Sequence, residues 1–272
     1  MQTRVGQDQF LVLHLSLPAQ LGQHFLIRDD ILTRLAEAAC GEHTPRVVEI
    51  GPGRGALTRY LLQRTDELHA IELDRSLVQY LQRHFAEESR LHLHQADVLE
   101  TDLAQWGPAA IAGNLPYYIT SPIIEKFLDL DDRFGTAVFL MQWEVAQRLL
   151  AGPGSRDYAY LTVATQLVCD MDLVCRVPPG AFSPPPKVDS GAVRLRRKPV
   201  IQSDRRELLK FVGRCFTQKR KTLRNNLRPF YGSSIEALPE AGLRAEQLSL
   251  ERFISLYQTL SNREPKQGSS VN

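Results

Sequence analysis

The sequence predicts an α/β protein that carries a second, smaller domain made of helices. Three observations support this fold class. Short apolar runs alternate with amphipathic runs from residue 46 onward, which is the pattern of a doubly wound sheet. After Pro199 the strand-like runs stop and only helical periodicity continues. The chain has 272 residues, enough for one large and one small domain.

The α/β part is predicted to contain buried strands connected by helices. Each strand is a short apolar run, because a parallel strand is covered on both faces. Strands are expected at residues 46–51, 68–74, 91–97, 109–114, 136–142 and 191–195. The runs between them have apolar residues at helical spacing. Helices are expected at residues 56–64, 75–85, 121–128, 143–150 and 160–168.

The last part of the chain is predicted to be helical. We place a domain boundary near Pro199, so that residues 21–198 form the α/β domain and residues 199–262 the helical domain. Helices are expected there at residues 204–216, 219–227 and 249–260.

The two ends of the chain are predicted to lie outside both domains. Residues 1–20 are expected to form an N-terminal extension. Their apolar run resembles the core of a signal sequence, but Asp8 precedes it and His14 interrupts it. Residues 263–272 are polar and are expected to form a flexible tail.

The composition excludes several classes of protein. No run approaches the roughly 18 apolar residues of a membrane-spanning helix, so no membrane contact is expected. The four cysteines lack CxxC spacing, which favours reduced thiols and a cytoplasmic protein. His92 and His94 alternate on one strand without a cysteine or acidic ligand at metal spacing, so no metal site is expected.

Positive charge is concentrated in one segment. The stretch from Arg194 to Arg228 contains 13 Lys or Arg residues and two acidic residues, a formal charge of +11 in a chain of net charge +2. Such a segment favours a nucleic-acid partner, because contacts to phosphates release condensed counterions. The alternative is a set of solvated helix faces. The candidate contacts are Arg194, Arg196, Lys219, Arg220, Lys221 and Arg224.

A glycine-rich segment, EIGPGRGALT (49–58), joins the first strand to the first helix. Glycines at this place allow close approach of a ligand to the main chain, so Gly51 and Gly53 are candidate cofactor contacts. The spacing GxGxG differs from the dinucleotide fingerprint, and a tight turn is the alternative. Glu72 ends the next strand about 20 residues later, where a carboxylate can accept hydrogen bonds from ribose hydroxyls. An NAD site would share these features.

Asp97 ends the third strand. A carboxylate there can accept a hydrogen bond from an adenine amino group, which is the arrangement of S-adenosylmethionine (SAM) sites in Rossmann-like methyltransferases. The alternative is an aspartate that caps a turn or helix. Because three strand ends in succession carry suitable groups, the sequence favours a SAM site.

The segment NLPYYIT (114–120) follows the fourth strand and should lie at the same sheet edge. The exocyclic amine of adenine is a poor nucleophile, and its methylation needs acceptors for the amine hydrogens. The Asn114 side-chain oxygen and the Leu115 carbonyl can provide them, with Pro116 fixing the turn. Tyr117 can stack on the base. The alternative is a proline turn beside core tyrosines.

These motifs resemble the KsgA-type small-subunit rRNA adenine dimethyltransferases. LGQHFL (21–26), FSPPPKVDS (182–190) and FTQKRKTLRNNL (216–227) add to the resemblance, which extends from about Leu21 to Leu260. It implies a SAM-dependent methyltransferase domain with a Rossmann-like fold over residues 21–198 and an α-helical RNA-binding domain over 199–262.

The resemblance also implies an activity and a set of site residues. The reaction is the dimethylation of two adjacent adenosines near the 3′ end of small-subunit rRNA, with the assembling ribosomal subunit as partner of a monomeric enzyme. Phe182 flanks the flipped adenine, while Asn114 and Tyr117 serve catalysis. The matched positions imply that SAM is contacted by His24, Leu26, Gly51, Glu72, Asp97 and Asn114.

Departures from the family pattern are visible, and three alternatives remain. Many relatives have Asn at the position of His24 and Ser at that of Thr120, both changes that keep hydrogen-bonding capacity. An Erm-type large-subunit rRNA methyltransferase shares the glycine loop and an N-x-P-Y motif, but PPPKVDS and QKRKTLRNNL oppose it. A DNA adenine methyltransferase would commonly have Asp where Asn114 stands. A non-catalytic RNA-binding assembly factor is opposed by the intact glycines, Glu72, Asp97 and Asn114.

Overall fold

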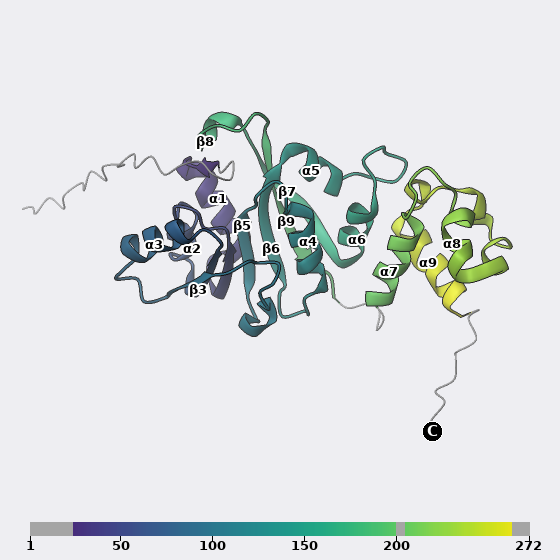
Figure 1. Cartoon of the computed structure of the whole chain (residues 1–272), viewed down its shortest axis with the longest axis horizontal. Helices are drawn as coiled ribbons and strands as arrows, with labels where there is room; N and C mark the ends of the chain where they lie inside the picture. The colour runs from purple at the N-terminus through teal and green to yellow at the C-terminus, as the bar shows by residue number, and fades with distance from the viewer. Residues whose placement is uncertain (1–23, 200–204, 263–272) are drawn as a thin grey trace, which may run out of the picture.

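The computed structural model describes residues 24–199 and 205–262 (Figure 1). The expected extension over 1–20 and the expected tail over 263–272 lie outside the described residues. None of the helices in the described ranges is long and apolar enough to cross a membrane.

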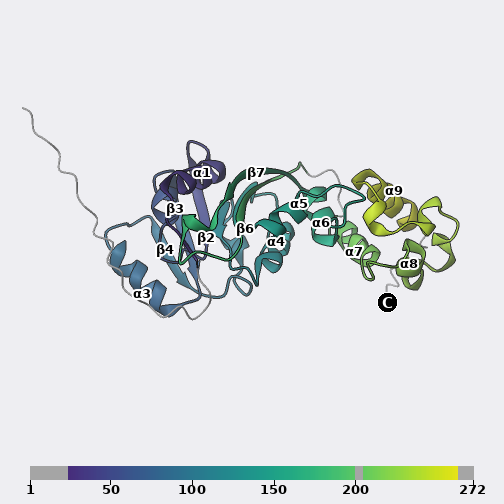
Figure 2. The ribbon, with the colours of Figure 1, turned by 90° about the horizontal axis from the view of Figure 1, so that it is seen from above.

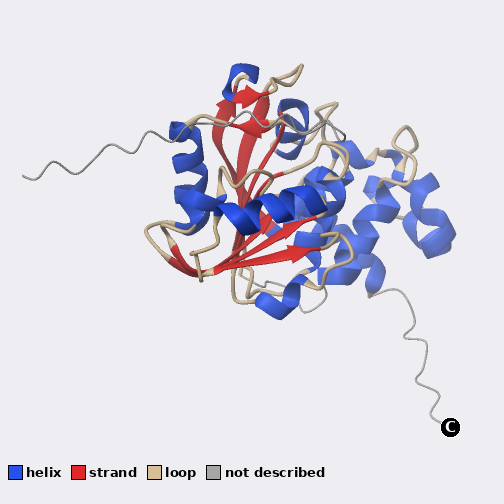
Figure 3. Ribbon diagram, turned by 60° about the vertical axis from the view of Figure 1, so that its left-hand side comes forward, coloured by secondary structure: helices blue, strands red, loops and turns tan. Residues whose placement is uncertain are grey.

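A mixed sheet forms the centre of the larger part of the molecule (Figure 3). Its strand order is β4-β3-β2-β5-β6-β9-β7. The first five strands are parallel, whereas β9 is antiparallel to both β6 and β7. The strands are β2 (Thr44–Ile50), β3 (Thr65–Glu72), β4 (Leu91–Gln95), β5 (Ala110–Asn114), β6 (Thr136–Gln142), β7 (Cys169–Val177) and β9 (Ser190–Arg197).

Helices cover both faces of the sheet. Two hydrophobic clusters, one on each face, hold them in place. One face packs against α1 (Asp29–Cys40) and α2 (Thr58–Leu61), and α3 (Arg75–His84) contacts β3 and β4. The other face packs against α4 (Thr120–Asp129), α5 (Trp143–Leu149) and α6 (Tyr160–Val168). Short 3₁₀ helices occur at η1 (Leu103–Trp106), η2 (Pro179–Ala181), η3 (Gly232–Ile235), η4 (Pro239–Gly242) and η5 (Ala245–Gln247).

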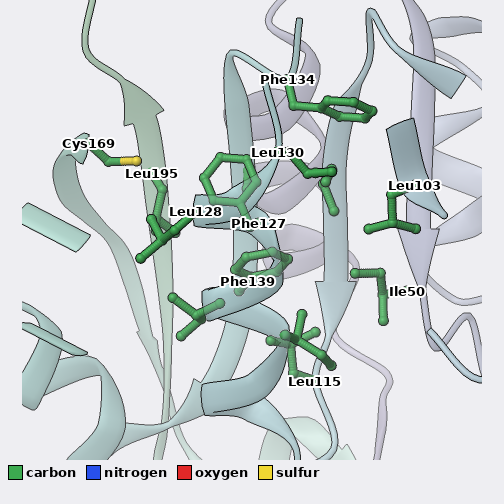
Figure 4. Packing of buried hydrophobic residues seen from close by; sticks show 14 of the residues in the cluster. Ile50, Leu103, Leu115, Phe127, Leu128, Leu130, Phe134, Phe139, Cys169 and Leu195 are labelled. Carbon is green, nitrogen blue, oxygen red and sulfur yellow. The ribbon is translucent and has the colours of Figure 1, made fainter. Parts of the chain in front are cut away.

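The hydrophobic cluster between α4 and the sheet holds this helix in place (Figure 4). Phe127 of α4 lies edge-on to Phe139 of β6, with ring centroids 6.2 Å apart. Both side chains are at most 1% exposed. Each such burial contributes about 1.5–3 kcal/mol. The helix start, which directly follows NLPYYI, is therefore anchored at the carboxyl edge of the sheet.

A second, two-stranded sheet lies beside this edge. β1 (Phe25–Leu26) pairs antiparallel with β8 (Phe182–Ser183), and Leu26 lies opposite Phe182. The main-chain NH of Ile27 also donates to the Ala181 carbonyl at 2.9 Å. These bonds attach the start of the described chain to the proline-rich segment more than 150 residues later.

The last three α-helices pack together at one end of the molecule, beyond α5 and α6 (Figures 1 and 2). They are α7 (Arg205–Cys215), α8 (Leu223–Tyr231) and α9 (Leu250–Ser261). Their hydrophobic cluster also includes Tyr158 and Val163, so the helices are anchored on the α6 region.

The α/β class with a helical C-terminal part, expected from the sequence, is confirmed. Individual elements differ. The helix expected at 56–64 is regular only over α2, because Gly55 has a φ of +79° before it and β3 begins at Thr65. The helix expected at 219–227 instead extends from Leu223 to Tyr231, because hydrogen bonds with the Asn226 side chain hold Gln218 in a turn before the helix. Helix α1 and strands β1, β7 and β8 were not expected.

Candidate active site

A cavity of about 340 Å³ lies at the carboxyl ends of β2, β3 and β5. This size suits a bound small molecule. Most of the residues predicted to form the cofactor and substrate site line this cavity, although they come from distant parts of the sequence. These are His24, Leu26, Gly51, Gly53, Glu72, Asn114, Leu115, Pro116 and Tyr117.

The glycine-rich segment forms one wall of the cavity. Gly51 and Gly53 have φ values of +66° and +57°, a region that side chains with a Cβ rarely adopt. A Cβ on Gly53 would also lie 3.0 Å from the Phe25 ring. Glycine is therefore needed here for conformation and for close packing against the N-terminal strand.

Glu72 ends β3 beside the glycine-rich segment and is 7% exposed. Its two oxygens accept main-chain hydrogen bonds from Gly53 at 3.1 Å and from Asp74 at 3.0 Å. Burial raises the pKa of Glu72, while these hydrogen bonds act in the opposite direction. A carboxylate offers about four acceptor sites, so the oxygens can still accept hydrogen bonds from a ligand.

Glu49 also lines the cavity, although it is not among the predicted site residues. It is 1% exposed and accepts a 2.7 Å hydrogen bond from the Thr58 hydroxyl. Burial, together with the nearby Glu72, raises the pKa of Glu49 to about 8, although the hydrogen bond from Thr58 acts in the opposite direction. Glu49 is therefore largely protonated at neutral pH. The sequence does carry one signal for Glu49, which is a carboxylate within the buried apolar run that precedes Gly51.

Asn114 is oriented by a long-range contact. Its Nδ2 donates to the main-chain carbonyl of His24 at 3.0 Å. A carbonyl can only accept, so the amide nitrogen must face His24. Within the described part of the chain, Asn114 Oδ1 and the Leu115 carbonyl accept no hydrogen bond. Two acceptors are therefore available at the cavity.

Tyr117 follows in a tight turn. The Pro116 carbonyl accepts from the NH of Ile119 at 3.2 Å and from the hydroxyl of Thr120 at 3.1 Å, which closes the turn. The Tyr117 hydroxyl lies 3.3 Å from the buried hydroxyl of Ser190. Ser190 is a second contact that the sequence analysis missed, although it ends the quoted motif FSPPPKVDS.

His24 connects this turn to the proline-rich segment. Its Nδ1 lies 2.8 Å from the Pro184 carbonyl, so Nδ1 carries the proton and donates. Its ring is 5.9 Å from that of Tyr117. The pairing of β1 with β8 reinforces the same connection.

Two predicted residues do not line the cavity. Asp97 lies just beyond β4, and its side chain accepts a 2.8 Å hydrogen bond from the NH of Leu99. This geometry is that of a turn aspartate. Phe182 is 3% exposed and belongs to the hydrophobic cluster that contains Leu26. Its position is that of a core aromatic, and its expected contact with a base stays a prediction.

The cavity residues suit SAM. The buried carboxylate of Glu72 stands where ribose hydroxyls need acceptors, and the glycine main chain permits close approach. Leu26 and Leu57 give the cavity apolar walls. A nucleoside attached to a small charged group therefore fits this set of residues.

The predicted RNA-binding residues fall into two groups. Arg194 and Arg196 lie on β9 and both pair with Asp172, at 3.0 and 2.9 Å. They lie opposite Val138 and Thr136 near the start of β6, away from its carboxyl end. The other residues lie on or before α8 and are exposed: Lys219, Arg220, Lys221 and Arg224.

Asn226 holds the segment before α8 in place. It is 5% exposed, and its amide donates to the carbonyls of Cys215 at 2.7 Å and Gln218 at 3.2 Å. Its Oδ1 accepts from the NH of Gln218 at 3.2 Å. The cationic residues 219–221 are thus presented on a fixed segment.

The histidines of β4 lie beside a third one. His69 Nδ1 is 3.0 Å from His94 Nε2, and the His69 and His92 rings are stacked 5.0 Å apart. Among the described residues, no group of three or more His, Cys, Asp or Glu residues has a geometry that could hold a metal ion.

Comparisons with known proteins agree with these features. Residues 15–262 match the family model described as ribosomal RNA adenine dimethylase. The ribosomal RNA small subunit methyltransferase A of Acidobacterium capsulatum is 41% identical over 258 residues, covering 90% of this chain and 91% of that protein. The protein of the same name from Saccharophagus degradans is 39% identical, covering 89% and 93%.

Two solved structures are similar over nearly the whole described chain. The dimethyladenosine transferase of Plasmodium falciparum has a TM-score of 0.77 at 26% identity and covers 88% of this chain and 98% of that one. The 23S rRNA methyltransferase ErmE has a TM-score of 0.69 at 28% identity, covering 87% and 99%.

Proposed function

Because this chain belongs to the ribosomal RNA adenine dimethylase family, we propose that it dimethylates the N6 amines of two adjacent adenosines near the 3′ end of small-subunit rRNA. It is a SAM-dependent methyltransferase. The observation that carries the residue-level proposal is the orientation of Asn114, which leaves Oδ1 available at the cavity.

Asn114 Oδ1 and the Leu115 carbonyl accept the two hydrogens of the adenine amine. These hydrogen bonds favour a tetrahedral nitrogen with a localised lone pair, so they stabilise the transition state more than the ground state. The Tyr117 ring stacks on the flipped base, and Ser190 positions that ring. SAM supplies an electrophilic methyl group on a sulfonium sulfur. The amine proton can leave to water, so no strong general base is needed.

The remaining cavity residues hold the cofactor. Glu72 accepts hydrogen bonds from the ribose, and Gly51 and Gly53 allow the cofactor to approach the main chain. His24 and Leu26 contact SAM from the N-terminal strand. For Asp97 the proposal is a contact to the adenine of SAM, and for Phe182 a contact to the flipped base. Neither side chain lines the cavity, so both contacts would extend the site beyond its present lining.

The helical part over residues 199–262 is proposed to bind rRNA. Support comes from the exposed cations beside α8, which Asn226 keeps in a defined segment. The proposed partner is rRNA within an assembling small subunit, bound by a monomer in the cytoplasm. To bind RNA, Arg194 and Arg196 must each give up the ion pair with Asp172 and form one with a phosphate group instead.

The large-subunit alternative is not favoured. The fold is common to both enzyme types, since ErmE is also a structural neighbour. The sequence relatives at about 40% identity are named small-subunit methyltransferases and match along nearly their entire length.

The decisive experiment uses labelled SAM and unmodified small ribosomal subunits. Label should appear on two adjacent adenosines near the 3′ end of the small-subunit rRNA, and mass spectrometry should identify N6,N6-dimethyladenosine. Asn114→Ala should remove the label while leaving a folded protein. Label on large-subunit rRNA, or no label with the wild-type enzyme, would refute the proposed function.

A further inference from the structure

Two tyrosines occupy the corners of the turn at the cavity. The hydrogen bond from the NH of Ile119 to the Pro116 carbonyl closes a four-residue turn, with Tyr117 and Tyr118 as its central residues. The Thr120 hydroxyl bonds to the same carbonyl, which fixes the turn against the start of α4. Both tyrosines line the cavity.

The two side chains differ sharply in their surroundings. Tyr117 is partly buried, and its hydroxyl has the Ser190 contact at 3.3 Å. Tyr118 is 62% exposed, which is unusual for a large aromatic side chain. Within the described residues it has no hydrogen bond and no ring contact. Tyr118 therefore places an exposed aromatic ring at the cavity, and this ring makes no hydrogen bond or ring contact with the other described residues.

In the substrate of the proposed reaction, the base next to the flipped adenosine needs a new stacking partner. When one of two adjacent adenosines enters the cavity, its neighbour loses a stacking partner, and unstacking costs a few kcal/mol. An aromatic ring outside the cavity can replace that partner, because every base presents a π-face. The positive side chain of Arg54 lines the same cavity.

Resting on the proposed function, we propose that Tyr118 stacks on the nucleotide next to the flipped adenosine. Tyr117 thus serves the base inside the cavity, and Tyr118 serves the base outside it. The rigid turn sets the separation of the two rings, so the enzyme binds two neighbouring bases in one defined arrangement. A nucleobase is favoured over a ribosomal protein as the partner, because the ring adjoins the cavity that receives the flipped base.

The test compares three variants with the wild type on unmodified small subunits. Tyr118→Ala should reduce kcat/KM about tenfold, mainly through KM, since one stacking contact is lost. Tyr118→Phe should remain within about twofold, because stacking needs only the ring. Leu173→Ala is the matched control, an exposed apolar side chain on β7 outside the cavity. SAM affinity and melting temperature should be unchanged in all three.

A cross-link identifies the partner directly. Tyr118→p-benzoylphenylalanine, irradiated in complex with small subunits, should become joined to rRNA at the methylated pair or its immediate neighbour. A cross-link to a ribosomal protein would overturn the inference. An unchanged kcat/KM for Tyr118→Ala, or an equal loss for Tyr118→Phe, would also overturn it. If the wild type itself methylates no small-subunit adenosine, the proposed function fails instead.

Discussion

The amide nitrogen of Asn114 donates to the main-chain carbonyl of His24 across 90 residues of sequence. This single hydrogen bond decides which end of the amide faces the cavity. It leaves the oxygen available at the cavity and joins β5 to the N-terminal strand. Activity and the position of β1 are therefore expected to depend on the same side chain.

Asn114→Asp should lower kcat about 100-fold, the usual order for a misplaced catalytic hydrogen-bond partner, because aspartate keeps an acceptor oxygen but loses the donor that orients it. Aspartate cannot donate to His24 and places negative charge against a carbonyl. Single-turnover methylation of unmodified small subunits measures the effect. Asn262→Asp, an exposed asparagine at the end of α9, serves as the control. A near-normal rate for Asn114→Asp would contradict the assigned orientation.

Tyr117→Phe and Ser190→Ala should have small and similar effects, since each removes the same hydrogen bond, worth about 0.5–1.5 kcal/mol. The double variant should be no worse than either single one, because the two residues act through one contact. Tyr117→Ala should be far worse, because the stacking surface is lost. A double-mutant cycle in kcat/KM checks this, and fully additive losses would show that the hydroxyls act separately.

Glu49→Gln should stabilise the protein increasingly as pH rises. The pKa of Glu49 is about 8 in the folded state and 4.5 as an ordinary value, so folding binds a proton that the unfolded chain releases over this range. The stability associated with that proton is complete below pH 4.5 and is lost as pH rises toward 8. Glutamine has no such loss and can still accept from Thr58.

Melting temperatures of the Glu49→Gln variant at pH 5, 7 and 8.5 measure this difference. The exposed Glu87→Gln change is the control and should show no trend with pH. A gap between Glu49→Gln and wild type that stays constant with pH would show that Glu49 is ionised in the folded protein.

The histidines of β3 and β4 should make the fold sensitive to acid. Burial lowers the pKa values of His69 and His94 below 6.5, and neighbouring imidazoles lower them further. For His69, Glu67 opposes this shift. The stabilising neutral forms are complete above pH 6.5 and are lost as pH falls through the lowered pKa values.

His94→Phe should reduce this acid sensitivity, because phenylalanine can still pack on Trp106 and carries no charge. Urea unfolding between pH 5 and pH 8 measures the effect. His43→Phe, at an exposed position, should leave the pH dependence unchanged. Equal acid sensitivity in the wild type, His94→Phe and His43→Phe would exclude the histidines of β3 and β4 as the cause.

The exposed cations beside α8 should determine the salt dependence of binding. Arg220→Ala, Lys221→Ala and Arg224→Ala should each weaken binding to small subunits and reduce the slope of log K against log salt by about 1. SAM affinity should not change. Arg196→Ala is the informative comparison, because Arg196 is already paired with Asp172. An equal effect of that variant would extend the RNA surface to β9.

The sequence alone determined the fold class and most of the cavity. Apolar runs separated by helical runs predict a largely parallel sheet, and the carboxyl ends of parallel strands meet at one edge. The glycine loop, Glu72 and Asn114 each follow a strand, so their convergence could be predicted without coordinates.

Only the tertiary structure decided how the groups are oriented, buried and paired. The Asn114 amide is turned by a carbonyl 90 residues away, and Tyr117 meets a serine 73 residues away. The burial of Glu49 raises its pKa, and packing in the cluster around Leu26 buries the Phe182 ring. Hydrogen-bond partners and desolvation depend on contacts between distant segments, and local sequence patterns carry no information about these.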